Sequence, residues 1–263
     1  MSQIQIQHLH KSYRNRRKRR RGPNDYNPGA RIPVLEDVNL CVENGEMVCI
    51  LGPSGCGKST LLRMVAGFDR QTSGEILIDG QPVAGPTSDN IFVFQQSGLL
   101  PWMTVWQNVE LGLRQLSDQA EKAERIQEAI GLVDLEGAED FYPHQLSGGM
   151  KRRAELARAL VVNPKILIMD EPFTGLDFFT HLRMREEVVN MHEFIRTTTL
   201  IVTHDVDDAL LMGDRVIVMS GRPSHVKLER LLKVPHPRNL AKHPELNSLR
   251  EEIFFMLGVS DAV

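Results

Sequence analysis

The sequence has few cysteines, no internal repeat and no long apolar run. Only 3 of its 263 residues are cysteines, and their spacing fits neither a set of disulfides nor a metal site, so we expect a reducing compartment. No apolar run approaches the ~20 residues needed to span a bilayer, and the first residues lack the apolar core of a signal peptide. We therefore expect a soluble chain, for which any membrane role requires a partner.

The basic charge is concentrated in one short run. Seven of the residues from Arg14 to Arg21 are Lys or Arg, whereas the whole chain has a net charge of −3, so the remainder is acidic. Because the basic residues are local and do not characterise the whole fold, we expect no nucleic-acid partner. The run itself has two interpretations, a solvated loop or a contact with anionic lipid headgroups or a protein partner.

One glycine-rich segment follows an apolar strand pattern at 47–51 and precedes a helical pattern at about 61–66. It matches the phosphate-loop pattern of Gly, four residues and Gly-Lys-Ser/Thr. The segment consists of Gly52, Pro53, Ser54, Gly55, Cys56, Gly57, Lys58, Ser59 and Thr60. Backbone N–H groups and the positive end of the helix would bind phosphate oxygens. Lys58 would add a charge at the outer phosphates, and Ser59 would hold Mg²⁺.

Strand patterns alternate with helical patterns, which implies an α/β fold with a mainly parallel sheet. Strands are expected at 4–6, 34–42, 47–51, 76–79, 91–94, 166–169, 200–202 and 216–219. Helices interrupt this order at about 104–116, 118–133 and 147–162. We therefore expect a single domain over 1–263, with a core at about 1–95 and 163–220, a helical subdomain at about 96–162 and a C-terminal extension at about 221–263.

The C-terminal part carries an amphipathic helical pattern from Pro244 to Leu257. Its apolar stripe consists of Leu246, Leu249, Ile253 and Leu257. Such a stripe can pack on the core of its own chain or on a partner. We expect the first arrangement, in which the terminal helix belongs to the domain.

Polar residues follow three of the expected strands, and phosphoryl transfer needs such groups beside the phosphates. Asp170 and Glu171 come directly after an apolar strand, at the edge where ligands bind in doubly wound sheets. Asp170 would hold Mg²⁺, and Glu171 would accept a proton from the attacking water. His204 ends another strand and would contact the γ-phosphate. Gln95 would reach Mg²⁺ or the water, and a simple strand-end cap is an equal alternative for it.

A second capped helix begins with two glycines. Ser147 stands at the N-cap, and Gly148 and Gly149 follow it. The start of this helix would form a second anion site, and the alternative is a helix that is merely well capped. Two phosphate-binding ends, separated by a helical insert, suggest composite sites between two chains.

Together these segments resemble the ATP-binding subunit of an ATP-binding cassette (ABC) transporter, over nearly the whole chain and in the family's motif order. Residues 52–60 are similar to its Walker A loop, Gln95 to its Q-loop glutamine, 146–150 to its signature, 166–171 to its Walker B strand, 175–177 to its D-loop and His204 to its switch histidine. Tyr13 matches the aromatic residue that stacks on adenine. The resemblance implies a P-loop NTPase (RecA-like) fold, with a mainly parallel sheet core, an antiparallel β edge and an inserted α-helical subdomain.

The resemblance also implies cofactors, partners and a location. It implies an ATPase that binds ATP and Mg²⁺, with Ser59, Gln95 and Asp170 serving the metal. Two subunits, expected to be identical, would pair head to tail. The residues that contact ATP of the other chain would be Ser147, Gly148, Gly149 and Asp177. Transmembrane permease subunits would hold the chain at the cytoplasmic face of the inner membrane, and a periplasmic or extracellular solute-binding protein would act indirectly.

A narrower resemblance is to importer ATPases for nitrate, sulfonates and taurine. The segments that carry it are 94–95, 99–105, 142–150 and 236–238. Three features depart from the usual pattern. Met150 replaces the commonest signature glutamine, and the basic insertion from Arg14 to Arg21 is unusual for this group. The segment 151–155 also differs, because Glu155 adds an unexpected charge and Arg152-Arg153 resembles lipid-trafficking cassettes. An importer of a small anion is the main expectation. The alternatives are the ATPase of a lipid-trafficking or export system and a soluble ABC ATPase outside transport.

Overall fold

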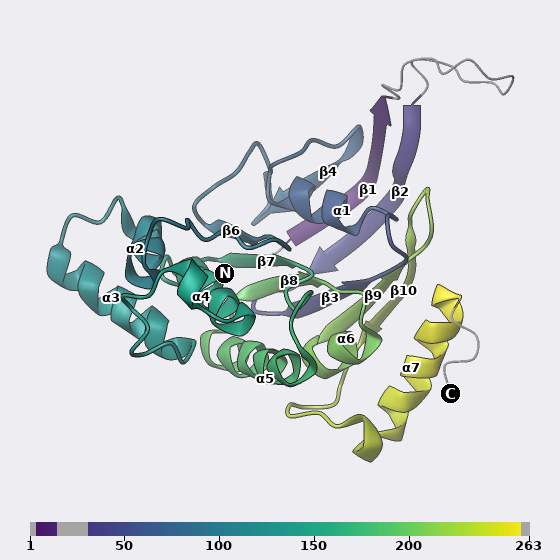
Figure 1. Ribbon diagram of the computed structural model, residues 1–263. Helices are drawn as coiled ribbons and strands as arrows, with labels where there is room; N and C mark the ends of the chain where they lie inside the picture. The colour runs from purple at the N-terminus through teal and green to yellow at the C-terminus, as the bar shows by residue number, and fades with distance from the viewer. Residues whose placement is uncertain (1–3, 15–30, 259–263) are drawn as a thin grey trace, which may run out of the picture.

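The computed structural model describes residues 4–14 and 31–258, which fold around two β-sheets (Figure 1). The larger sheet has the strand order β10-β9-β3-β8-β7-β6, and the smaller has the order β2-β1-β4-β5. The larger sheet consists of β3 (Met47–Leu51), β6 (Asn90–Val93), β7 (Ile166–Asp170), β8 (Thr198–Val202), β9 (Arg215–Met219) and β10 (Val226–Leu231). The smaller consists of β1 (Ile4–Arg14), β2 (Arg31–Val42), β4 (Ser73–Ile78) and β5 (Gln81–Pro82). Most of the basic run that ends at Arg21 lies outside the described residues.

The central strands run parallel, and the smaller sheet is antiparallel. β3 pairs in parallel with β8 and β9, and β7 pairs in parallel with β6 and β8. β1 pairs antiparallel with β2 and β4, and β10 pairs antiparallel with β9. The predicted α/β fold with a mainly parallel core and an antiparallel edge is therefore confirmed. β10 has no counterpart among the predicted strands, because most of its residues are exposed and half are charged.

The described part of the chain contains seven α-helices, which are α1 (Lys58–Val65), α2 (Val105–Glu110), α3 (Gln119–Leu132), α4 (Gly148–Leu160), α5 (Phe178–Ile195), α6 (Val206–Met212) and α7 (Pro244–Leu257). The helices α2, α3 and α4 lie between β6 and β7 in the chain and form the lobe at the left of Figure 1. Side chains of Thr104, Asp118 and Ser147 accept backbone N–H groups and cap these three helices. The helix predicted at 104–116 is shorter than expected, since a 3₁₀ turn at Leu111–Leu113 follows α2.

Side chains of the central strands alternate between two cores, one on each face of the larger sheet. In β7, Leu167 and Met169 share a core with residues of α4, α5 and α6. Ile166 and Ile168 share the other core with residues of α1, β1 and β2. Burial on both faces explains why the sequences of β3 and β7 are apolar almost throughout. The strands are thereby held with their carboxyl ends at a common edge.

The terminal helix α7 packs on its own chain, beside α6 (Figure 1). Leu246, Leu249 and Ile253 are buried in the same core as α5 and α6. Arg250 of α7 donates to both carboxylate oxygens of Asp207 in α6, at 2.5 and 3.2 Å. The apolar stripe of this helix therefore packs as its sequence predicts.

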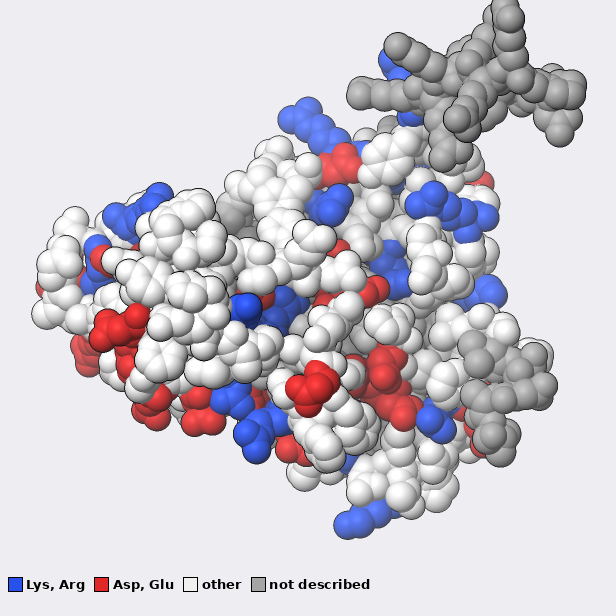
Figure 2. All heavy atoms as spheres, in the orientation of Figure 1, with Lys and Arg blue, Asp and Glu red and all other residues white. Residues whose placement is uncertain are grey.

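Among the described residues, every helix is too short or too polar to cross a lipid bilayer. On the face that Figure 2 shows, basic and acidic side chains are interspersed among uncharged ones. Ten aromatic residues of the described chain are exposed, including Trp102, Phe178 and Phe179.

The substitution Ile253→Ala tests the packing of α7. Ile253 is 0% exposed, so the truncation should leave a cavity and lower the free energy of unfolding by about 2–5 kcal/mol. Phe255→Ala is the matched control, because Phe255 is 79% exposed in the same helix and its loss should change this free energy by less than ~0.5 kcal/mol. Chemical denaturation followed by circular dichroism measures both. Equal effects of the two substitutions would contradict the described packing.

Candidate functional site

The phosphate loop connects β3 to α1 and lies against β2. Gly57 stands at the N-cap of α1 with a φ of 124°, a backbone angle that favours glycine. A Cβ atom at this position would lie 2.8 Å from Cγ1 of Val34 and 2.9 Å from Cδ2 of Leu35. Glycine is therefore needed here for the backbone angle and also for the close approach to β2.

Lys58 brings its ammonium group back over the phosphate loop. Its Nζ donates to the carbonyl oxygen of Gly52 at 2.6 Å and to that of Pro53 at 3.2 Å. The residue is only 6% exposed. Cys56 is also buried, whereas the tip of the loop at 53–55 is exposed. The loop thus combines a cation with the free N–H groups of a helix start, and both bind phosphate oxygens.

The hydroxyl of Ser59 in α1 meets the carboxylate of Asp170 at the end of β7. Ser59 Oγ donates to Asp170 Oδ1 at 3.0 Å. Burial raises the pKa of Asp170, the hydrogen bond from Ser59 opposes this increase, and the neighbouring charge of Glu171 adds to it. A hydroxyl and a carboxylate are oxygen ligands that suit Mg²⁺, and a cation between them would offset the buried negative charge. The pair therefore fits a magnesium ion.

Glu171 continues past β7 in a left-handed conformation, with a φ of 48°. Its backbone N–H donates to the carbonyl oxygen of Val202 at 2.8 Å, which keeps it attached to β8. Its carboxylate oxygen Oε2 accepts hydrogen bonds from Gln95 Nε2 at 2.9 Å and from Thr174 Oγ1 at 3.0 Å. Because Asp170 bonds to Ser59 instead, the two adjacent acids have separate surroundings.

His204 lies near the same oxygen of the Glu171 carboxylate. Its Nδ1 is 3.6 Å from Glu171 Oε2, and its side chain is 64% exposed. The imidazole is therefore accessible to a bound ligand. Gln95, Glu171 and His204 meet because parallel strands end at the same edge of a sheet, and the phosphate loop leaves this edge after β3.

Tyr13 lies at the end of β1, beside the first turn of α1. Its hydroxyl donates to Asp69 Oδ2 at 2.6 Å, and Lys11 Nζ lies 4.6 Å from the ring centroid. Burial raises the pKa of Tyr13, the hydrogen bond with Asp69 adds to this increase, and a hydrogen bond with Thr60 opposes it. Tyr13 is 41% exposed, so the hydroxyl is anchored while part of the ring stays open to a planar ligand. Asp69 was not predicted from the sequence, since only the fold brings it to Tyr13.

Four of the predicted residues form a separate surface, which we call the signature surface: Ser147, Gly148, Gly149 and Asp177. Ser147 caps α4 by accepting the N–H of Met150 at 3.2 Å, and Asp177 caps α5 by accepting the N–H of Thr180 at 3.1 Å. A Cβ on Gly149 would lie 2.5 Å from Thr180 Cγ2, so glycine allows the two helix starts to touch. Within residues 4–14 and 31–258, no hydrogen bond or ion pair joins the signature surface to the phosphate loop.

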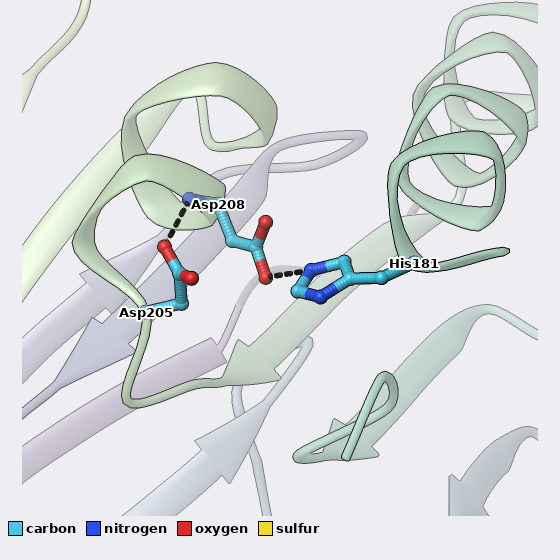
Figure 3. A group of neighbouring side chains, drawn as sticks. All are labelled: His181, Asp205 and Asp208. Carbon is cyan, nitrogen blue, oxygen red and sulfur yellow. Dashed lines mark hydrogen bonds and ion pairs between the residues drawn. The ribbon is translucent and has the colours of Figure 1, made fainter. Parts of the chain in front are cut away.

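A further polar cluster links α5 to α6 and was not predicted from the sequence (Figure 3). His181 Nε2 lies 2.7 Å from Asp208 Oδ2, and Arg185 donates to the same carboxylate at 3.3 Å. Asp205 accepts the N–H of Asp208 at 3.0 Å and caps α6. Ligand atoms of the two acids and the histidine lie within 4.8 Å of one another, close enough for a metal ion. The cap and the pairing with Arg185 explain these carboxylates without a metal, as a bridge between the two helices.

Three known proteins resemble this chain over most of its length. The nitrate import ATP-binding protein NrtD of Synechocystis sp. is 43% identical over 225 residues, which cover 85% of this chain and 85% of that protein. The aliphatic sulfonates import ATP-binding protein SsuB of Bacillus cereus is 41% identical over 208 residues, which cover 79% of this chain and 82% of that protein. The solved dimeric structure of the ATP-binding cassette MJ0796, in a post-hydrolysis state bound to ADP and Pi, is 32% identical and covers 88% of this chain and 100% of that chain, with a TM-score of 0.71.

A comparison with models of protein families also identifies an ABC protein. The model of the ABC transporter family matches residues 35–174, which is more than half of the chain. The matched range contains the phosphate loop, Gln95, Asp170 and Glu171. The chain therefore belongs to the ABC transporter family, and it is an ABC-type ATPase that binds ATP with a P-loop NTPase fold.

Proposed function

We propose that this chain is the ATP-hydrolysing subunit of an importer that takes up a small anion such as nitrate, a sulfonate or taurine through separate membrane subunits. Its similarity to NrtD and SsuB, which are named for nitrate and aliphatic sulfonate import, supports this class of solute. One observation supports the catalytic assignment above all others. Gln95 and Thr174 hold the carboxylate of Glu171 beside the edge from which the phosphate loop leaves, with His204 3.6 Å away.

Residues 52–60 would bind the triphosphate of ATP through their backbone N–H groups. The ammonium of Lys58 would exchange the carbonyl oxygens of Gly52 and Pro53 for phosphate oxygens, which are stronger partners because they carry charge. Ser59, Gln95 and Asp170 would hold Mg²⁺, which when bound offsets the negative charge of the phosphates. Tyr13 would stack on the adenine ring.

Glu171 would act as the general base. Its carboxylate would accept a proton from the water that attacks the γ-phosphorus, while the bond between this phosphorus and the bridging oxygen breaks and ADP leaves. The hydrogen bonds from Gln95 and Thr174 would orient the carboxylate, and His204 would contact the γ-phosphate. Because Asp170 serves the metal, the two adjacent acids would perform different tasks.

We further propose that two copies pair head to tail, so that the signature surface of one chain covers the ATP held by the other. The cassette MJ0796 is dimeric in the structure that contains ADP and Pi. Phe178 and Phe179 directly follow Asp177, are 69% and 79% exposed, and would be covered in such a dimer. The N–H groups at the start of α4 would then contact the γ-phosphate of the second chain's ATP.

The remaining partners in this proposal are transmembrane permease subunits and a solute-binding protein that acts through them. The chain would lie at the cytoplasmic face of the inner membrane as a peripheral subunit. Both NrtD and SsuB are named as import ATP-binding proteins, which supports an assembly of this kind. Nucleic acid has no part in it.

Affinity purification of the tagged chain from its own host tests these partners. We expect recovery of a membrane protein with several spans, and ATPase activity in proteoliposomes that rises when the solute-binding protein and its solute are added. Nitrate, taurine and an alkyl sulfonate would be compared at equal concentration. Activity that responds to phospholipid and to none of the three anions would instead identify a lipid-trafficking cassette.

The substitution Glu171→Gln tests the general base, because glutamine keeps the size of the side chain and cannot accept the proton. The variant should bind ATP and dimerise with MgATP. Its rate of ATP hydrolysis should fall by at least about 100-fold. Phosphate release and size-exclusion chromatography measure these properties. Glu128→Gln, at an exposed site of α3, is the control and should hydrolyse ATP at the normal rate. Normal turnover by the Glu171 variant would remove the assignment.

The substitution Asp170→Asn separates burial from metal binding. Because burial raises the pKa of Asp170, its ionised form destabilises the metal-free fold, so the variant should melt at a higher temperature than the wild type near neutral pH. As the pH falls through the raised pKa, the wild-type carboxyl takes up a proton and the difference should shrink. MgATP should raise the melting temperature of the wild type much more than that of the variant. A metal-free variant less stable than the wild type near neutral pH would contradict this prediction.

A further inference from the structure

Helix α4 holds both ends of an exposed segment, residues 94–98, which we call the Q segment. This segment follows β6 and has no regular secondary structure. Arg152 Nη1 donates to the carbonyl oxygen of Phe94 at 2.8 Å. At the other end, the N–H of Gly98 donates to Glu155 Oε1 at 2.6 Å. Two side chains of one helix thus fix the path of the Q segment through its main chain.

These two side chains also form a buried ion pair with each other. Arg152 Nη1 lies 2.6 Å from Glu155 Oε2, and the side chains are 6% and 4% exposed. A buried ion pair loses so much hydration that its net contribution to stability is small or unfavourable. Among the described residues, Nε and Nη2 of Arg152 have no hydrogen-bond partner, which adds to the unfavourable terms. Stability alone therefore does not explain the pair, whereas attachment of the Q segment does.

A third side chain of α4 completes the attachment. Arg158 Nη1 donates to the carbonyl oxygen of Gly98 at 2.7 Å, so the N–H and the carbonyl of this glycine are both bonded to α4. A Cβ on Gly98 would lie 3.0 Å from Arg158 Nη2, so a larger residue would require this guanidinium group to shift. The charge at Glu155 is unexpected from the sequence. In the fold its carboxylate pairs with Arg152 and accepts the N–H of Gly98.

The Q segment carries Gln95, whose Nε2 donates to Glu171 Oε2 at 2.9 Å. The reach of this amide depends on the backbone that carries it, and α4 holds that backbone on both sides of Gln95. We propose that Arg152 and Glu155 are positioning residues, which set the place where Gln95 meets the carboxylate of Glu171. This inference rests on the catalytic roles proposed above for Gln95 and Glu171.

A double-mutant cycle between Glu155→Ala and Gln95→Ala tests this inference, using steady-state hydrolysis of MgATP by the full chain. Glu155→Ala should lower kcat by about 10-fold to 100-fold and change KM for ATP by less than about twofold, because it displaces a catalytic contact and leaves the phosphate loop intact. Gln95→Ala should lower kcat at least as much. In the Gln95→Ala background, the change at Glu155 should alter kcat by less than about twofold, because its effect passes through Gln95.

Control variants separate positioning from folding. Glu187 is another glutamate that pairs with α4, through Arg153, but it does not contact the Q segment. The substitution Glu187→Gln removes its charge and should leave kcat unchanged. Glu155→Gln keeps an acceptor for the N–H of Gly98 and should retain most of the activity that Glu155→Ala loses. If thermal melts show that Glu155→Ala is unfolded, Arg152→Lys enters the same cycle, because it keeps the charge beside Glu155 and lacks the planar group that also bonds to Phe94.

The outcomes distinguish this inference from the function on which it rests. Equal losses of kcat from the Glu155 substitution in both backgrounds would overturn the positioning role, since the effect would then not pass through Gln95. Slow turnover by Gln95→Ala together with normal turnover by Glu155→Ala would overturn it as well and leave the proposed role of Gln95 intact. Normal turnover by Gln95→Ala would remove that role, and the positioning inference with it.

Discussion

Parallel pairing of the central strands is the constraint that assembles this site. β3, β8, β7 and β6 lie side by side, and Val202 of β8 pairs with both Ile50 of β3 and Asp170 of β7. The loop segments that leave this edge therefore begin close together, which brings Glu171 next to Gln95 and His204. Burial of both strand faces fixes the register, since a slip of one residue would exchange the side chains of the two cores.

Local features of the sequence predict much of the fold and the components of the site. Apolar runs identify β3 and β7, glycine spacing identifies the phosphate loop, and cap residues identify the starts of α2 and α4. These signals are local, because each arises from burial or hydrogen bonding within a few residues. β10 shows the limit of such signals: an exposed edge strand needs few apolar residues, and so its pattern resembles that of a loop.

The contacts that orient the site residues could not be predicted from the sequence, because most of them join positions far apart in the chain. Asp69 anchors Tyr13, and Glu155 bonds to Gly98, although more than 50 residues separate the partners in each pair. Thr174 lies only three residues after Glu171, but its contact depends on the left-handed turn at Glu171. The sequence thus shows which groups are present, whereas the fold determines which of them meet.

Helix α4 connects two parts of the proposed mechanism, since it begins at the signature surface and also holds the Q segment. The general base itself is best tested by an experimental structure of the dimer with a slowly hydrolysed ATP analogue and Mg²⁺. We expect the Glu171 carboxylate about 3 Å from a water molecule in line with the γ-phosphorus, with the signature surface of the second chain against the same phosphate. A Glu171 carboxylate turned away from the γ-phosphate, with its hydrogen bond to Gln95 lost, would contradict the proposed mechanism.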